Sequence, residues 1–413
     1  MNSRLRRGPS PILLAAAAFW CACFFALGMR SAGGSRGAAG DPAAELPELE
    51  RALASGDRLR EAETLTPILR SLGASDVDAV AGAFERAFGS GAGRGLALQL
   101  LTERLAALDP LTARERILAW PHAQRSEALP ILVHVWARRD PQAALDALNR
   151  IRDPEIQQNA FPAMIEGWGE SGLPGVWRYL ASLPVGLDRE RGTLTLVSNR
   201  IRRDGSAAAL REIEELSPEW AGEEFRSSAL RTLVGLVARI DPARATAIAE
   251  AHRDDRDGGL LMRRVAVNWV TQDGAAAMSW LCDQPASRQR DRVLREAYRR
   301  WIVRNRPAAI AWFGARGDLG ELGALADLYA TALTRVDPRA AIAFLERIED
   351  PARRLEASAD VAEVWRGADP EAARAWIEQA GLREELERRE ARRAARRERA
   401  AAASPPPPRA AAP

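Results

Sequence analysis

Cysteine is scarce in this chain, with three residues among 413. Cys21 and Cys23 lie in an apolar N-terminal run, which leaves Cys282 as the single cysteine of the remaining sequence. A disulfide within residues 31–413 is therefore excluded, and a protein of this kind must be stabilised by packing. Cys282 lies on a predicted helix, where we expect a small buried side chain rather than a reactive thiol.

Histidine is equally scarce, and His122, His134 and His252 have neither a second ligand at helical spacing nor a nucleophile motif nearby. Zinc sites and hydrolytic triads therefore lack sequence support. The acidic stretch that follows His252 resembles part of a calcium loop, but Arg253 and Arg264 stand where an EF-hand needs acids. The sequence identifies no catalytic, cofactor-binding or metal-binding residue, and we expect no cofactor.

Lysine is absent, so all 59 basic residues are arginine, and 56 acidic residues reduce the net charge to +3. This balance argues against nucleic acid as a partner of the chain as a whole. Arginines gather just before predicted helix starts, as at Arg138–Arg139 and Arg202–Arg203. Cations at a helix C-terminus complement the helix dipole, and a functional basic stripe is the alternative interpretation.

A period of 32 residues, interrupted once by an interval of 37, runs through most of the sequence. It is marked by Asp140, Gly172, Asp204, Asp241, Asp273, Asn305, Asp337 and Asp369. Four of these positions are followed by proline, which suits the first turn of a helix that begins with an Asp cap. Such a period predicts a helical repeat rather than a single enzyme core.

Five of the repeats contain a second start signal thirteen residues after the first. These signals are Asp153, Ser217, Asp254, Asp318 and Asp350. Two helix starts per repeat, each followed by apolar residues at helical spacing, predict one hairpin of two antiparallel helices. The fold class is therefore all-α: an α/α superhelical solenoid of about eight 32-residue hairpins.

Small and aromatic residues recur at fixed places in the repeat. An alanine pair follows the first cap, and small side chains let neighbouring helices approach closely. Tryptophan recurs four residues before the cap, as in Trp301, and seven residues after it, as in Trp312. Leu333 and Phe344 fill the same two positions in another repeat. This exchange indicates packing in the core rather than a carbohydrate-binding cleft.

Five extra residues in one repeat lie near Pro218–Glu224. Insertions in repeat arrays emerge as loops or lengthened helix starts on one face, which is sometimes the binding face. Trp220, within this insertion, is a candidate contact residue, although the core is the more ordinary place for tryptophan.

The N-terminus carries an export pattern. Arg4, Arg6 and Arg7 precede an apolar segment, so residues 1–30 are predicted to be a signal peptide or a signal anchor. We therefore expect an exported protein, periplasmic or extracellular, that an uncleaved segment would anchor in the inner membrane. Both alternatives stay open at the level of sequence.

The remaining segments complete the predicted organisation. Residues 31–41 form a flexible linker, 42–108 an irregular helical capping region and 109–382 the solenoid. Residues 383–399 are a charged Arg/Glu/Ala helix, and the Pro/Ala-rich tail 400–413 is expected to be disordered. A contact of this C-terminal region with anionic lipid or nucleic acid is an alternative to a solvated helix.

Over the solenoid, the chain resembles the tetratricopeptide-like superfamily in its type of repeat. The pattern is best kept at Trp365–Trp376, where Trp, Asp-Pro, an alanine pair and Trp follow one another. The period of 32 residues departs from the usual 34. The resemblance implies binding of a protein or peptide in a groove and brings no catalytic residue.

Two functions follow from these observations. We expect a non-catalytic scaffold, exported or membrane-anchored, that binds a protein or peptide along the solenoid surface. The alternative is a helical-toroid enzyme that acts on polysaccharide or cell-wall glycan, with two carboxylates about 5–10 Å apart beside exposed tryptophan.

Overall fold

The structure is a computed structural model that describes residues 58–71, 73, 77–88, 95–316 and 319–403. These residues form helices and turns and contain no strand, which confirms the all-α prediction. The predicted signal or anchor segment 1–30, the linker 31–41, residues 42–57 and the end of the tail, 404–413, lie outside the described residues, as does Asp318. Among the described residues, no helix is both long enough and apolar enough to cross a membrane.

The chain divides into two compact units, Met1–Val135 and Trp136–Pro413. The helices of the first unit are α3 (Arg58–Ser71), α4 (Val77–Phe88), α5 (Leu96–Leu108), α6 (Pro110–Ala119) and α7 (His122–Ala137), the last of which runs into the second unit.

The first unit has an apolar core, in which α5 packs against α3 and α6. Asp109 begins α6 by accepting hydrogen bonds from the backbone of Leu111 and Thr112 at 3.0 and 3.2 Å. Glu85 accepts a hydrogen bond from the indole of Trp120 at 2.9 Å, which ties α4 to the end of α6.

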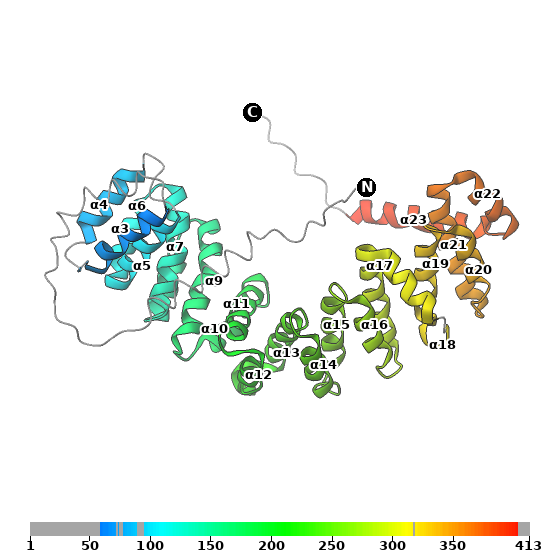
Figure 1. Cartoon of the computed structure of the whole chain (residues 1–413), viewed down its shortest axis with the longest axis horizontal. Coiled ribbons are helices and arrows are strands. Elements are labelled where there is room, and N and C mark those ends of the chain that lie inside the picture. Colours follow the sequence, from blue (N-terminus) through cyan, green and yellow to red (C-terminus); the bar gives the residue numbers. More distant parts are fainter. Residues whose placement is uncertain (1–57, 72, 74–76, 89–94, 317–318, 404–413) are drawn as a thin grey trace, which may run out of the picture. The chain divides into compact units, whose positions relative to one another are not determined.

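The second unit is a series of helices that belong to two alternating sets (Figure 1). One set, mostly the shorter and here called the first helices, consists of α8 (Pro141–Asn149), α10 (Val176–Ser182), α12 (Ser206–Glu214), α14 (Pro242–Ala251), α16 (Gly274–Cys282), the part of α17 (Arg288–Arg316) after Asn305, α20 (Pro338–Leu345) and α22 (Pro370–Gln379). The second helices are α9 (Pro154–Ser171), α11 (Leu187–Asp204), α13 (Pro218–Val237), α15 (Gly258–Trp269), the part of α17 before Asn305, α19 (Ala326–Thr334), α21 (Pro351–Ala368) and α23 (Arg383–Ala403).

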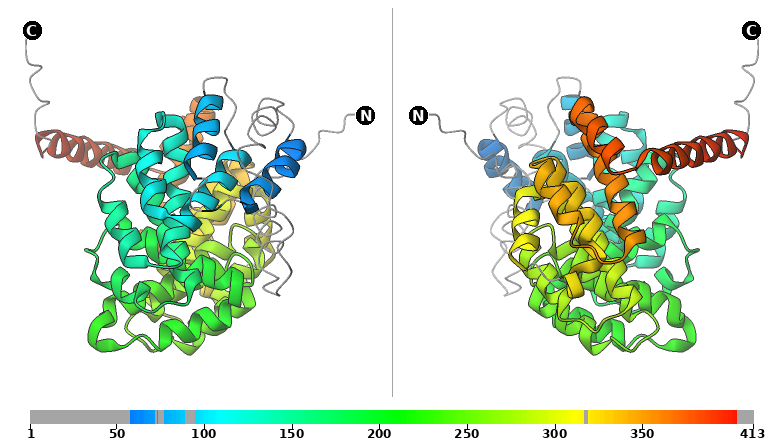
Figure 2. Two further views of the ribbon diagram at one scale, coloured as in Figure 1. Left: turned by 90° about the vertical axis from the view of Figure 1, so that its left-hand side faces the viewer. Right: turned by 90° about the vertical axis from the view of Figure 1, so that its right-hand side faces the viewer.

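The two sets of helices occupy different sides of this unit. Each second helix from α9 to α19 packs against the next second helix, and most first helices pack against their own second helix. In Figure 1, α15, α17 and α19 lie on one side of the row, while α14, α16 and α20 lie on the other. The short α18 (Leu319–Leu322) and the 3₁₀ turn η2 (Gly323–Leu325) lead into α19. The last helix, α23, contacts α21 as far as Arg393 and then extends beyond it (Figure 2).

Most predicted caps are present. The carboxylates of Asp140, Asp241, Asp273, Asp337 and Asp369 each accept a backbone hydrogen bond from the first turn of the following helix, as do those of Asp153 and Asp350 and the hydroxyl of Ser217. Asn305 does the same for Ala308 at 3.3 Å and breaks α17 into its two parts. These starts follow from residues at most three positions apart, which explains why sequence identifies them.

Three predicted starts are wrong. Gly172 ends α9 in a left-handed conformation, and α10 begins after Gly175 instead. Asp204 belongs to the last turn of α11, where it pairs with Arg200 at 3.2 Å, so Gly205 takes the position before α12. In both places, glycine at positive φ decides where the chain turns.

The third error is Asp254, since α15 begins four residues later, after Asp257. The turn before α15 brings the backbone carbonyl of Arg253 so close to Gly258 that a Cβ there would overlap it. Gly258 therefore allows a close approach of the backbone at this turn. The Asp254 carboxylate caps nothing in this arrangement.

The insertion lengthens the start of a second helix. Ser217 caps the first turn of α13, and Gly222 at φ 68° then interrupts the helix before it continues to Val237. Trp220, on that added turn, is half-buried, and the guanidinium of Arg178 lies 5.7 Å from the centre of its ring.

The recurring tryptophans pair between helices. Ring centroids of Trp269 and Trp280 are 6.2 Å apart, those of Trp301 and Trp312 are 5.8 Å apart, and those of Trp365 and Trp376 are 6.0 Å apart. Trp301 is buried and the other five are half-buried against the apolar core. The prediction that these tryptophans pack in the core is confirmed. Cys282 is likewise buried, as expected.

Candidate functional site

The second helices are linked by ion pairs between consecutive repeats. In each pair, a side chain of one second helix, or of the turn that leads into it, meets an opposite charge on the next. The pairs are Glu166–Arg202, Arg231–Asp257, Arg263–Glu296, Arg295–Asp327 and Asp360–Arg389, at 2.5–2.8 Å. We call the solvent-exposed surface of the second helices, on which these pairs lie, the second-helix face.

The two central pairs have fork geometry. Arg263 donates from Nε and Nη2 to the two carboxylate oxygens of Glu296, at 2.6 and 2.7 Å. Arg295 donates from Nη1 and Nη2 to the two carboxylate oxygens of Asp327, at 2.5 and 2.6 Å. Two parallel charge-assisted hydrogen bonds set orientation as well as distance. The pairs therefore hold α15, α17 and α19 in a defined register.

The hydrogen bonds from Arg263 lower the pKa of Glu296 below its usual range, and the charges of Arg263 and Arg300 act in the same direction. Because the folded pKa lies below the unfolded one, the pair contributes stability above the ordinary carboxyl pKa of about 4.3 and loses it as the pH falls through the folded value.

Replacing Glu296 with glutamine is therefore expected to reduce the free energy of unfolding at neutral pH by about 0.2–1 kcal/mol, as for other partly exposed pairs. The difference from the unchanged protein should shrink below about pH 4, where the carboxylate of the unfolded chain is protonated. Urea unfolding at both pH values measures it, with the exposed Glu349→Gln as the control. An equal loss of stability at both pH values would contradict the assignment.

At the C-terminal end of the second-helix face, the pKa of a paired carboxylate is raised instead of lowered. Burial raises the pKa of Asp360, the hydrogen bond from Arg389 opposes that rise, and the carboxylates of Asp327 and Glu363 add to it. Arg389 donates to Asp360 at 2.6 Å, and Arg393 donates to Glu363 at 2.7 Å. The charged helix α23 thus places arginines over the acidic surface of α21.

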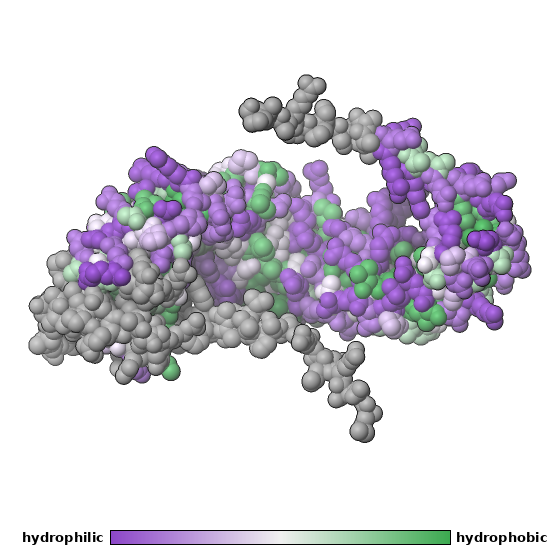
Figure 3. Space-filling model, turned by 90° about the horizontal axis from the view of Figure 1, so that it is seen from above, coloured by the Kyte–Doolittle hydropathy of each residue, from purple (hydrophilic) through white to green (hydrophobic). Residues whose placement is uncertain are grey.

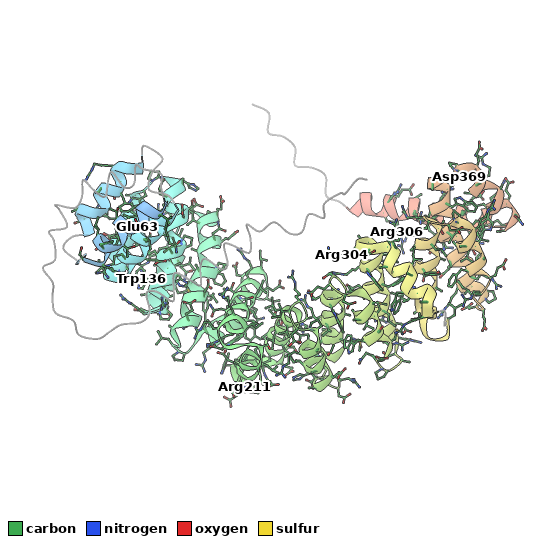
Figure 4. The ribbon with its side chains drawn as sticks, in the orientation of Figure 1. Glu63, Trp136, Arg211, Arg304, Arg306 and Asp369 are labelled. Atoms are coloured by element: carbon green, nitrogen blue, oxygen red, sulfur yellow. The ribbon has the colours of Figure 1, made fainter. Side chains whose placement is uncertain are left out.

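Apolar side chains are also exposed among these charges. Leu194 on α11 and Leu260 on α15 are 47% and 41% exposed, and Val303 on α17 is 83% exposed. Figure 3 shows a mainly hydrophilic surface with smaller apolar areas between the charged ones. Arg304 and Arg306 flank Asn305 at the turn within α17, and both are labelled in Figure 4. A mixture of charged and isolated apolar side chains suits contact with protein.

The other residues that sequence singled out do not gather into a site. His252 contacts Asp255 at 2.7 Å and Glu214 at 3.5 Å. In the part of the chain that the structure describes, no group of three or more His, Cys, Asp or Glu side chains is arranged to hold a metal ion.

Sequence reasoning missed the ion pairs, although a signal was present. Arg231, Arg263, Arg295 and Asp327 follow one another at intervals of 32 residues, and all four belong to the linking pairs. A charged residue that recurs with the repeat period therefore indicates the exposed side of the second helices.

Comparison of the chain with protein-family models, with curated proteins and with solved structures finds no match. Any functional conclusion for this chain therefore rests on its own residues.

Proposed function

We propose that this chain is a non-catalytic helical-repeat scaffold that binds a protein or peptide partner along the second-helix face. In this proposal the second unit is a superhelical solenoid, and the protein is exported, with residues 1–30 as signal peptide or membrane anchor. The observation that carries the proposal is that ion pairs join second helices of successive repeats, from α9 to α11 and from α13 through α15 and α17 to α19.

Two features of the face support binding of protein. Its arginines are held by carboxylates on neighbouring helices, so partner groups would meet side chains already set in position, which lowers the entropy cost of association. Leu194 and Leu260 stand exposed beside the charged positions and offer apolar contact area. Exposed apolar residues within a polar surface are typical of protein interfaces.

The alternative is an enzyme of helical-toroid type that acts on polysaccharide or cell-wall glycan. It requires two carboxylates about 5–10 Å apart beside tryptophan rings that stack on sugar. The carboxylates named above on the second-helix face are engaged with arginines, and the paired tryptophans pack against the core. We therefore prefer the scaffold.

The test is site-directed photo-cross-linking of the full chain in its native cells. A photo-cross-linking residue in place of Leu194 or Leu260, on the second-helix face, is expected to give protein adducts of defined mass. The same residue in place of Arg211 or Arg374, exposed on first helices, serves as the matched control and should give none. Envelope and cytosolic fractions are analysed separately by mass spectrometry.

Adducts that appear equally at the second-helix and the first-helix positions, or at neither, would contradict the scaffold function. Adducts confined to the cytosolic fraction would contradict export of the protein. Release of soluble sugar from cell-wall glycan by the purified full chain would favour the enzyme.

A further inference from the structure

The positive charge of the chain is concentrated on one second helix. Residues 288–306, which form the first part of α17 and its turn, contain eight arginines and two acidic residues, a net charge of +6 in a chain whose total is +3. The rest of the molecule is therefore slightly acidic. This concentration is local, as a basic partner site in a nearly neutral protein must be.

Four exposed arginines on α15 and α17, besides Arg304 at the turn, have guanidinium groups with no hydrogen bond or ion pair to another described residue. We call them the arginine face: Arg264 on α15 and Arg288, Arg292 and Arg299 on α17. The last three are spaced so that they follow one side of the helix. The arginines beside them, Arg263 and Arg295, are paired with carboxylates.

Helix stability does not explain the arginine face. Arg288 is the first residue of α17, where a cation interacts unfavourably with the helix dipole. The arginines that the sequence places at helix C-termini have that explanation, whereas Arg288 does not. Unpaired like charges on neighbouring turns also repel one another, so an anion bound there would relieve an unfavourable arrangement.

The surroundings favour carboxylates of a protein over a nucleic-acid backbone. Glu296 lies on α17 between Arg292 and Arg299 in sequence, and Asp327 on α19 pairs with the neighbouring Arg295. These fixed negative charges would repel a continuous row of phosphates. Leu260 and Val303 stand four residues from Arg264 and Arg299, one helical turn away. They are 41% and 83% exposed and suit apolar side chains of a peptide. The structure already shows how this surface binds acids, through forked arginine–carboxylate pairs.

We infer that the arginine face binds an acidic segment of the partner protein, whose carboxylates pair with Arg264, Arg288, Arg292 and Arg299. This inference rests on the scaffold function proposed above and names the chemistry of the partner. The charges of the face also speed encounter with such a segment and select against basic ones.

The spacing of the arginines constrains the bound segment. Arg292 and Arg299 are separated by about 10 Å along the helix axis, at 1.5 Å per residue. In a polyproline II segment, residues three apart lie on the same side and about 9 Å apart. An acidic residue at every third position therefore matches the two arginines.

The inference is tested by fluorescence anisotropy with the full chain. The probe is a labelled peptide of repeated Glu-Pro-Ala, and the neutral comparison is repeated Gln-Pro-Ala. A single-stranded RNA with the same number of negative charges is the competing class. The double variant Arg292→Glu, Arg299→Glu alters the face, and Arg211→Glu, Arg374→Glu makes the same charge change on first helices. Thermal unfolding of both variants checks that the fold is kept.

At about 0.15 M salt the Glu peptide is expected to bind, and the Gln peptide at least tenfold more weakly. Reversal of Arg292 and Arg299 should weaken binding of the Glu peptide by tenfold or more, and the control variant should leave it within twofold.

Equal weakening by the two variants, or no binding of the Glu peptide, overturns the inference. RNA that binds more tightly than the peptide also overturns it and assigns the face to nucleic acid. If the peptide fails while cross-linking at Leu260 still yields a protein adduct, the scaffold function stands and only the acidic partner is rejected.

Discussion

Replacing Trp301 with alanine is expected to reduce the free energy of unfolding by about 3–5 kcal/mol. The indole is only 6% exposed and lies at the centre of an aromatic cluster, with ring centroids 6.4 Å from Tyr298 and 5.8 Å from Trp312. Removing it leaves a cavity that rigid neighbouring rings cannot fill.

The surroundings of Trp301 also prevent the structure from collapsing into the cavity. Tyr298 is fully buried, and its hydroxyl donates to the backbone carbonyl of Ala309 at 3.0 Å, which joins the two parts of α17 across the break at Asn305. Urea unfolding of the full chain measures the loss. Trp220→Ala is the comparison, because that ring is half-buried, and its loss should be clearly smaller. An unchanged free energy of unfolding for Trp301→Ala would contradict the interpretation that the tryptophans pack in the core.

Replacing Gly274 with alanine is expected to destabilise the protein by about 1–3 kcal/mol, although alanine is the better helix former. Gly274 is the first residue of α16, directly after the cap Asp273, and a Cβ there would overlap the indole of Trp301. Neither the ring nor the capped helix start can shift without disturbing the cluster around them.

Two controls isolate this contact. Gly367, on α21, has no heavy atom within 4 Å of an added Cβ, so Gly367→Ala should be neutral or stabilise by up to about 1 kcal/mol. In a protein that already carries Trp301→Ala, the penalty of Gly274→Ala should largely disappear, since the two residues share one contact. An unchanged penalty in that background would show that the cost arises elsewhere.

Local signals in the sequence predicted much of the helical framework. Where Asp is followed by Pro, as at Asp140 and Asp369, the cap, the missing N–H and the helix start lie within a few residues, and the structure shows each of them. Where a glycine adopts a positive φ, as at Gly172 and Gly205, the helix starts one to a few residues later than the 32-residue period predicts. A period marks where a helix pair recurs, whereas a positive φ marks where the chain actually turns.

The candidate site was less predictable. The sequence showed that arginine is abundant, and it placed the arginines at helix ends. It did not show that Arg263 faces Glu296 while Arg264 faces solvent, because the side on which each residue lies depends on the helix that packs beside it. The ion pairs join residues about one repeat apart, so they exist only after neighbouring repeats have packed.

The sequence by itself determined the all-α character of the protein, the two-helix unit and most helix starts, since hydrophobic period and capping act over a few residues. Only the tertiary structure decided which arginines are neutralised, which glycines accept a neighbouring ring or carbonyl, and which side of the second helices remains open. Those outcomes depend on distances of a few ångströms between residues on different helices, which no local pattern specifies.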